Sequence, residues 1–353
     1  MKTNHNIFVA ASQNMGFLDD GSVDLIVTSP PYPMIQMWDD VFSRQNVLAA
    51  YMLLKNFSRA FEHIHYELDK VWKECHRVLR PGGFLCVNIG DATRTTVEGF
   101  QLFNNHSRVV ECCLGLGFEC LPGIIWRKQT NAPNKFMGSG MLPCGAYVTQ
   151  EHEWILVFRK KGRREFKTRE EKNIRRESAF FGEERNKWFS DMWEIKGVRQ
   201  NISSLSRERS AAFPLEIPFR LINMYSVQGD TVLDPFLGLG TTTIAAMICG
   251  RNSVGVEIDS QLLPSIQKNI SGLGLKKMNE TIMQRYQRHL EFVDEREKAG
   301  KEVKYFNQNL GCKVMTAQET DIKLRCLKYI SKRVNDDSLI FECRYFDGMD
   351  AFD

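Results

Sequence analysis

The stretch "TVLDPFLGLGTTTIAAMICGRNSVGVEID", residues 231–259, decides the fold. An apolar run that ends at Asp234 predicts a strand, the apolar segment after the paired glycines predicts a helix, and a second apolar run that ends at Glu257 predicts another strand. Strands and helices alternate in the same way along much of the remaining chain. This alternation is typical of a doubly wound, mostly parallel α/β sheet with helices on both faces.

The turn inside this unit has the features of a ligand site. Gly238 and Gly240 let the backbone turn sharply and approach a ligand, and the helix after them begins with free N–H groups. Glu257 ends the second strand, where a carboxylate can accept hydrogen bonds from ribose hydroxyls. Thr243 stands in place of the third glycine of a pyrophosphate-binding fingerprint. The pattern therefore favours an adenosine ligand without a diphosphate.

A second strand end carries polar groups. The stretch "VDLIVTSPPYP", residues 23–33, is an apolar run closed by Ser29, Pro30, Pro31 and Tyr32. Sheets of this kind bind ligands at the carboxyl ends of their strands. The prolines stiffen the turn, the Ser29 hydroxyl and the Pro30 carbonyl are acceptors, and Tyr32 offers a flat ring. These four residues fit either a plain turn at the end of a strand or a site for a planar heteroaromatic amine, such as the amino group of a nucleobase, which must flip out of a duplex to enter.

The segment between these units is basic. Residues 159–208 are dense in lysine and arginine, with glutamates interleaved. The whole chain has a net charge of only +4, so composition alone does not indicate a nucleic-acid partner. The segment fits either a solvated, salt-bridged surface or a surface that contacts phosphates. The loop of residues 129–150 is long and rich in Gly, Pro and Asn, which favours a functional or mobile segment.

Composition bounds the class of protein. The ten cysteines include no Cys-x-x-Cys pair, which indicates reduced thiols and a cytoplasmic location. The seven histidines show no metal-ligand spacing beyond His63 and His65, so we expect no metal. No apolar stretch is long enough to span a membrane, and we expect no membrane association.

Three motifs in one consistent order resemble those of the amino-methylating DNA methyltransferases. The stretch "TSPPY" (28–32) resembles their catalytic motif, and "LDPFLGLGTT" (233–242) resembles their cofactor motif. The stretch "RSAAFPLEIP" (209–218) is similar to their segment that packs on the cofactor. A catalytic motif that precedes the cofactor motif, with a basic insert between them, resembles the circularly permuted β group of this family.

The resemblance implies a Rossmann-like methyltransferase sheet and methyl transfer from S-adenosyl-L-methionine to the exocyclic N4 of cytosine in duplex DNA. Cytosine is favoured because a serine in the first motif position is commoner among the family's cytosine-modifying members. In the implied mechanism Ser29 and the Pro30 carbonyl orient the amine, and Tyr32 stacks on the flipped base. The implied catalytic residues are Ser29, Pro30, Pro31 and Tyr32; the implied cofactor-binding residues are Asp234, Phe236, Gly238, Gly240, Thr241, Glu257 and Phe213; and the implied DNA-binding residues of the insert are Arg159, Lys160, Lys161, Arg163 and Arg164.

The same resemblance divides the chain into four parts. Residues 1–158 would be the catalytic half of the methyltransferase domain, 159–208 the target-recognition insert, and 209–275 the cofactor-binding half. Residues 276–353 begin with a charged helical pattern and are expected to be a helical extension of unknown role.

The expected partner is double-stranded DNA, and the resemblance adds a cognate restriction endonuclease and a homodimer as partners to test. Three alternatives stay open at this point. The first is adenine N6 methylation by the same fold. The second is a DNA-binding protein that kept the fold without catalysis, and the third is a protein or RNA methyltransferase, because the same pocket suits other planar amines.

Overall fold

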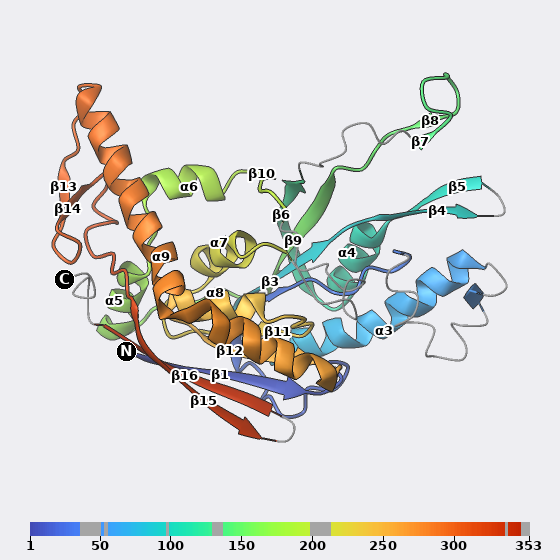
Figure 1. The fold of residues 1–353 in the computed structure, drawn as a ribbon, viewed down its shortest axis with the longest axis horizontal. Helices are drawn as coiled ribbons and strands as arrows, with labels where there is room; N and C mark the ends of the chain where they lie inside the picture. The colour runs from blue at the N-terminus through green and yellow to red at the C-terminus, as the bar shows by residue number, and fades with distance from the viewer. Residues whose placement is uncertain are drawn as a thin grey trace.

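The computed structural model of the chain describes residues 1–35, 51–52, 56–96, 99–128, 137–197, 213–335 and 338–346. Its main feature is a ten-stranded sheet (Figure 1). From one side of the sheet to the other the strands are β10 (Met192–Glu194), β6 (Phe118–Arg127), β9 (His152–Lys160), β3 (Leu79–Ile89), β2 (Val23–Thr28), β11 (Thr231–Asp234), β12 (Asn252–Glu257), β1 (Lys2–Val9), β16 (Ser338–Tyr345) and β15 (Leu327–Asn335).

Parallel pairing dominates the centre of this sheet. Strands β3, β2, β11, β12 and β1 all run in one direction. Strand β9 toward one side and strand β16 toward the other run antiparallel to both of their neighbours. The predicted doubly wound, mostly parallel sheet is confirmed.

The strand order reverses between β2 and β11. The chain leaves β2 toward β3 on one side and leaves β11 toward β12 on the other. Leu25 and Ile26 of β2 pair in parallel register with Val232 and Leu233 of β11. A reversal of this kind opens a crevice at the carboxyl ends of the two strands. The turn after β2 and the glycine loop after β11 therefore meet at one place.

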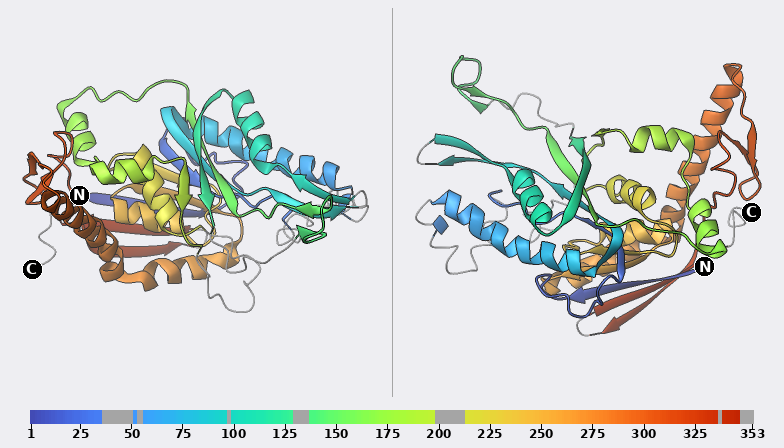
Figure 2. Two further views of the ribbon diagram at one scale, coloured as in Figure 1. Left: turned by 90° about the horizontal axis from the view of Figure 1, so that it is seen from above. Right: turned by 180° about the vertical axis from the view of Figure 1, so that it is seen from behind.

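Helices cover both faces of the sheet (Figure 2). One face packs against α3 (Phe57–Val78) and α4 (Asn105–Gly115). The other packs against α7 (Glu216–Tyr225), α8 (Thr241–Cys249) and α9 (Leu263–Lys298), and the short 3-10 helix η3 (Ser260–Leu262) leads into α9. The apolar residues of α3 that face the sheet are buried at helical spacing: Leu68, Val71, Trp72, Cys75 and Val78. None of the described helices combines the length and the apolarity that crossing a membrane requires.

Two short hairpins project from the edge of the sheet at which the central parallel strands end (Figure 1). We call this edge the C-terminal edge and the opposite one the N-terminal edge. One hairpin joins β4 (Ala92–Thr96) to β5 (Gly99–Phe103), directly after β3. The other joins β7 (Met137–Gly138) to β8 (Ala146–Tyr147), between the end of β6 and the start of β9.

The insert and the tail pack together at the N-terminal edge. The insert contributes α5 (Arg169–Glu177) and α6 (Gly182–Trp188), and the tail contributes the second half of α9 and the hairpin of β13 (Tyr305–Asn307) and β14 (Cys312–Val314) (Figure 1). Arg285 of α9 donates to Glu184 of α6 over 2.7 Å, and the Phe181 ring stacks on His289 with centroids 3.8 Å apart. The two segments thus form one unit that was not predicted.

The tail is not the helical extension predicted for residues 276–353. Helix α9 ends at Lys298, and the described chain beyond it forms strands. Two of these, β15 and β16, pair with each other, and β16 pairs with β1, so they extend the main sheet. The prediction was wrong because it extrapolated from the charged helix and overlooked the alternating burial encoded in "SLIFECRY".

Strand β1 lies between two partners that are far away in sequence. It pairs in parallel with β12, about 250 residues later, and in antiparallel with β16 near the end of the described chain. Thr3, His5 and Ile7 are fully buried, whereas Lys2 and Asn4 face outward. One face of this strand is therefore polar along most of its length.

Candidate active site

The turn after β2 is held by hydrogen bonds to its polar side chains. The Ser29 and Tyr32 oxygens are 3.0 Å apart, and the Tyr32 hydroxyl donates to Glu153 Oε2 over 2.9 Å. The Asn88 amide donates to the Tyr32 oxygen over 2.7 Å and to Glu153 Oε2 over 2.8 Å. Burial and the charge of Glu153 raise the pKa of Tyr32 well above its ordinary value, so the hydroxyl stays protonated.

The proline residues place this turn rigidly. Pro30 is buried and Pro31 half-buried, and neither has an N–H that would need a partner. The Asn105 amide of α4 donates to the carbonyls of Pro33, over 3.0 Å, and Gly90, over 2.9 Å. The ends of β2 and β3 are thereby tied together beside Tyr32.

Tyr32 differs from the open stacking platform expected from the sequence. The side chain is 4% exposed, and its ring lies against the backbone of Gly90. The hydroxyl points into the hydrogen-bond cluster described above rather than into solvent. Stacking on a flipped base therefore stays a prediction.

Asp234 links the two halves of the site. Its Oδ1 accepts from the Thr28 hydroxyl over 2.7 Å and from the Phe236 N–H over 3.0 Å, and its Oδ2 accepts from the Thr242 hydroxyl over 2.6 Å. Burial raises the pKa of Asp234 from its ordinary 3.8 to about 6, and these hydrogen bonds oppose that rise. Asp234 was predicted to hold the cofactor, but in the structure its carboxylate joins the last residue of β2 to the first turn of α8.

The glycine loop has the shape expected of a ligand cradle. Gly238 and Gly240 have φ of 53° and 83°, the left-handed region that glycine adopts without strain. Helix α8 begins with Thr241, and its first N–H groups face the loop. A Cβ placed on Gly238 would meet no atom within 4 Å, so there is open space beside the backbone. A ligand can approach the loop at this point.

Glu257 lies at the other side of the loop. Its carboxylate oxygens accept from the N–H groups of Gly238 and Asp259, both over 3.0 Å. Burial raises its pKa, and these backbone hydrogen bonds oppose the rise. Each oxygen keeps a lone pair that could accept from a ribose hydroxyl. The next residue, Ile258, is 68% exposed and offers an apolar surface to the flat face of a base. These residues fit an adenosine-containing ligand.

Two other predicted cofactor residues contact the core. Phe236 is half-buried and packs edge-on against Trp72, with ring centroids 6.1 Å apart. Phe213 is 5% exposed within the core cluster on the α7 side. The first four residues of the segment 209–218 lie outside the described residues. Among the residues that the structure describes, no three His, Cys, Asp or Glu side chains form a metal-ligand group.

The five residues predicted to bind DNA lie toward the N-terminal edge of the sheet, whereas Ser29 lies at the C-terminal edge. Strand β9 is antiparallel to β3, so Arg159 pairs with Phe84 in the middle of β3, and Lys160 follows it toward the N-terminal edge, away from the turn that holds Ser29. Lys160 donates to the carbonyls of His76 and Leu79 over 2.6 and 2.7 Å, and Arg159 forms an ion pair with Glu119. The charged groups of Arg159 and Lys160 therefore stabilise the fold through contacts within the protein.

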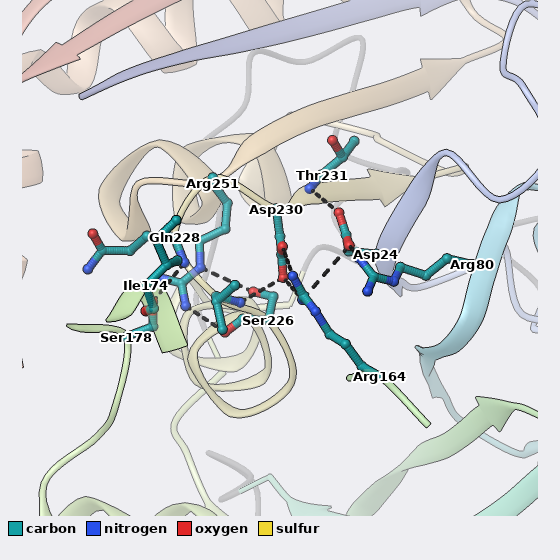
Figure 3. Close-up of polar contacts among 12 residues, drawn as sticks. Asp24, Arg80, Arg164, Ile174, Ser178, Ser226, Gln228, Asp230, Thr231 and Arg251 are labelled. Carbon is teal, nitrogen blue, oxygen red and sulfur yellow. Dashed lines mark hydrogen bonds and ion pairs between the residues drawn. The ribbon is translucent and has the colours of Figure 1, made fainter. Parts of the chain in front are cut away.

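Arg164 has a similar structural role (Figure 3). Its guanidinium binds both carboxylate oxygens of Asp230 and lies near Asp24, which in turn is bound by Arg80. Only Lys161 and Arg163 of the cluster are exposed. The structure therefore does not support the predicted role of these five residues in binding DNA at the catalytic turn.

Three residues of the site were missed by the sequence prediction. Asn88 and Glu153 complete the cluster around Tyr32, and the Lys128 ammonium forms an ion pair with Glu153 Oε1. A signal was present, because a polar residue interrupts the buried run "FLCVNIGD" and an acid opens the strand "EWILVFRK". Only the antiparallel pairing of β9 with β3 shows that the two meet.

Known proteins are similar to this chain in sequence and in fold. The sequence model of a family described as DNA methylase matches residues 23–268. The Type II methyltransferase M.MthZI of Methanothermobacter thermautotrophicus is 50% identical over 345 residues, which cover 97% of this chain and 96% of that protein. The chain belongs to the N6/N4 DNA methylase family.

Further relatives of this DNA methyltransferase are also described as DNA-modifying methylases or Type II methyltransferases. The Type II methyltransferase M.MjaI of Methanocaldococcus jannaschii is 48% identical over 280 residues, covering 76% of this chain and 91% of that protein. A solved protein of Thermus thermophilus, described as a DNA modification methylase complexed with S-adenosyl-L-methionine, is 31% identical with a TM-score of 0.60, covering 76% of this chain and 93% of that one. The family, the Rossmann-like fold and the cofactor of the family, as predicted from the sequence, are confirmed.

Proposed function

We propose that this DNA methyltransferase transfers a methyl group from S-adenosylmethionine to the exocyclic N4 of cytosine in a specific sequence of duplex DNA. The names of M.MthZI and M.MjaI, both Type II methyltransferases, support a place in a restriction–modification system. A cognate restriction endonuclease that cuts the same unmodified sequence is part of this proposal, as are a homodimer and a location in the cytoplasm.

The observation that carries the proposal is the link through Asp234. Asp234 accepts hydrogen bonds from both Thr28 and Thr242. One carboxylate therefore fixes the residue before Ser29 and the first turn of α8. A methyl donor held beside Gly238 and Glu257, which are hydrogen-bonded to each other, would then lie next to an amine held at Ser29. Two ligand-binding loops at one strand reversal are what a methyl transfer between two bound molecules needs.

The cofactor supplies an electrophilic methyl group on a positively charged sulfur. For its part, the chain would bind the ribose through Glu257 and the base against Ile258, with the glycine loop close to the sulfur end. Ser29 Oγ and the Pro30 carbonyl would accept the two hydrogens of the target amine. Such fixed acceptors stabilise the positive charge that grows on the nitrogen during the reaction.

Cytosine is proposed over adenine on the basis of the motif. Ser29 stands where the adenine-modifying members of the family more often have an aspartate. A hydroxyl and a carbonyl can accept from either amine, so this argument concerns family usage and not a difference in hydrogen bonding. Adenine N6 methylation is therefore an explicit outcome of the test below.

We propose that DNA approaches along the C-terminal edge, where Ser29 lies. The hairpin of β7 and β8 projects there, and its apolar side chains are unusually open: Met141 is 87%, Leu142 69% and Val148 89% exposed. The ring of Tyr147 stacks on Phe100 of the neighbouring hairpin at 4.6 Å, which braces the two. Apolar side chains on a braced projection suit insertion between base steps.

The test uses purified protein, methyl-labelled S-adenosylmethionine and duplex DNA, followed by mass spectrometry of the nucleosides. Label in N4-methylcytosine is expected. Label in N6-methyladenine would replace the cytosine assignment and keep the mechanism, whereas label in 5-methylcytosine or no transfer to DNA would refute both. Ser29→Ala should lose most of the activity and keep cofactor binding, and Ser22→Ala at the N-terminal edge is the matched control.

A further inference from the structure

We propose that Glu153 is the final acceptor of the proton that the target amine releases, and that this proton travels through Ser29 and Tyr32. The inference rests on the proposed function, because it concerns the same target amine at Ser29. It assigns a role to Glu153, which no motif of the sequence identified.

The three residues form a continuous chain of oxygens. Ser29 Oγ lies 3.0 Å from Tyr32 Oη, and Tyr32 Oη lies 2.9 Å from Glu153 Oε2. Both distances allow a hydrogen bond of ordinary length. The chain leads from the predicted position of the amine to a carboxylate whose side chain is 13% exposed.

The donation from Tyr32 to Glu153 sets the arrangement of the hydrogens in this chain. A phenol has a single hydrogen, and Tyr32 donates it to Glu153. The Tyr32 oxygen must then be an acceptor toward Ser29, as it is toward the Asn88 amide 2.7 Å away. Ser29 therefore donates its own hydrogen inward and leaves its lone pairs free for the amine. The hydroxyl is oriented by the charge at the far end of the chain.

The step balances in atoms and charge. The amine nitrogen forms a bond to the methyl carbon with its lone pair as the carbon–sulfur bond breaks and leaves its electron pair on sulfur. The nitrogen then carries one proton in excess. That proton passes to Ser29 Oγ as the Ser29 hydrogen passes to Tyr32 and the Tyr32 hydrogen passes to Glu153. The products are a neutral methylated amine and a protonated carboxyl.

Each hydroxyl in this sequence gives up one hydrogen as it gains another. Tyr32 is thus never ionised, which agrees with its burial. Lys128 holds the second carboxylate oxygen of Glu153 and is 37% exposed, so the acceptor is fixed on one side and close to solvent on the other. Water can take the proton from Glu153 after each turnover.

The test measures the single-turnover rate of methyl transfer to duplex DNA, with cofactor and DNA affinities measured separately. Glu153→Gln keeps the shape but cannot take a proton, and Tyr32→Phe breaks the chain. Each should lower the rate about a hundredfold, the contribution typical of a general base, with both affinities within threefold of wild type. The double variant should be no slower than either single one.

A second measurement separates proton acceptance from a structural role. Glu153→Ala leaves room for a small carboxylate, so formate should restore part of the rate while chloride should not. Glu151→Gln, two residues away and paired with Arg127 at the surface, is the matched control and should react at the wild-type rate. Loss of activity without rescue by formate, or full activity in Tyr32→Phe, would overturn the inference. A wild-type protein that transfers no methyl group to DNA would instead refute the proposed function.

Discussion

Replacing Thr28 by valine tests whether the link through Asp234 joins the two halves of the site. The change keeps the β-branched shape that suits the end of β2, and it removes only the hydroxyl that donates to Asp234 over 2.7 Å. Thr28 is fully buried and Asp234 is 3% exposed, so water cannot replace the lost donor without rearrangement. The carboxylate would keep its contacts with Thr242 and the Phe236 N–H.

The expected loss follows from the kind of hydrogen bond. A buried hydrogen bond to a charged acceptor contributes about 1.5–3 kcal/mol to the free energy of unfolding. At pH 8 Asp234 is ionised, so we expect the full loss. At pH 5 the carboxyl is protonated, because its pKa is about 6, and the loss should fall toward about 1 kcal/mol, as for a neutral pair.

Urea unfolding at the two pH values measures this loss, and the single-turnover rate of methyl transfer measures its effect on the site. Thr231→Val at the start of β11 is the matched control, because the hydroxyl of Thr231 makes no hydrogen bond with the residues that the structure describes. We expect Thr28→Val to lower the rate as well, since β2 and the glycine loop lose a shared anchor.

The double variant Thr28→Val with Thr242→Val tests whether the two hydroxyls act through the same carboxylate. Both hydroxyls bind one carboxylate, so their effects on the free energy of unfolding should not be additive. A Thr28→Val protein within about 0.5 kcal/mol of the Thr231→Val control at pH 8, with an unchanged rate, would refute the role given to Asp234.

Four further outcomes are expected. Glu257→Ala should weaken S-adenosylmethionine binding in calorimetry by about 1.5–3 kcal/mol, and unchanged affinity would remove Glu257 from the site. Arg164→Ala should cost about 2–4 kcal/mol in urea unfolding and leave the salt dependence of DNA binding unchanged; a shallower salt slope would restore the DNA-binding prediction. Met141→Ser with Leu142→Ser should slow methylation of duplex DNA more than of DNA with a mismatched target, and equal slowing would exclude insertion between base steps. Finally, the folded pKa of Asp234 is raised, so stability is gained as pH falls from about 6 toward 4; Asp234→Asn should lack this gain in unfolding measured across that range.

The sheet and its two ligand loops could be predicted because each depends on local sequence. Apolar runs identified β2, β11 and β12, and the glycines and Glu257 marked the ligand loop of the β11–β12 unit. The motif order then placed the two loops in one fold. The periodicity and the loop residues are local information, and only the motif order relates stretches that are far apart in the sequence.

The misplaced features depend on long-range pairing. Arg159 and Lys160 follow an apolar strand, and nothing nearby in the sequence says that this strand runs antiparallel to β3. Because β9 runs in this direction, the charges of Arg159 and Lys160 lie toward the N-terminal edge and not at the C-terminal edge. The same pairing brings Glu153 to Asn88, so one unpredicted strand direction explains both the error and the omission.

The position of β1 between β12 and β16 has a consequence for synthesis on the ribosome. At about 5–20 residues per second, the roughly 250 residues that separate β1 from β12 take about 12–50 seconds to appear. During this time β1 has neither of its sheet neighbours and could pair with another nascent chain. Lys2 on its outward face disfavours such pairing, because charged side chains discourage edge-to-edge association, and the neighbouring Asn4 keeps that face polar. The polar face of a strand that is later enclosed on both sides thus protects the chain before it is complete.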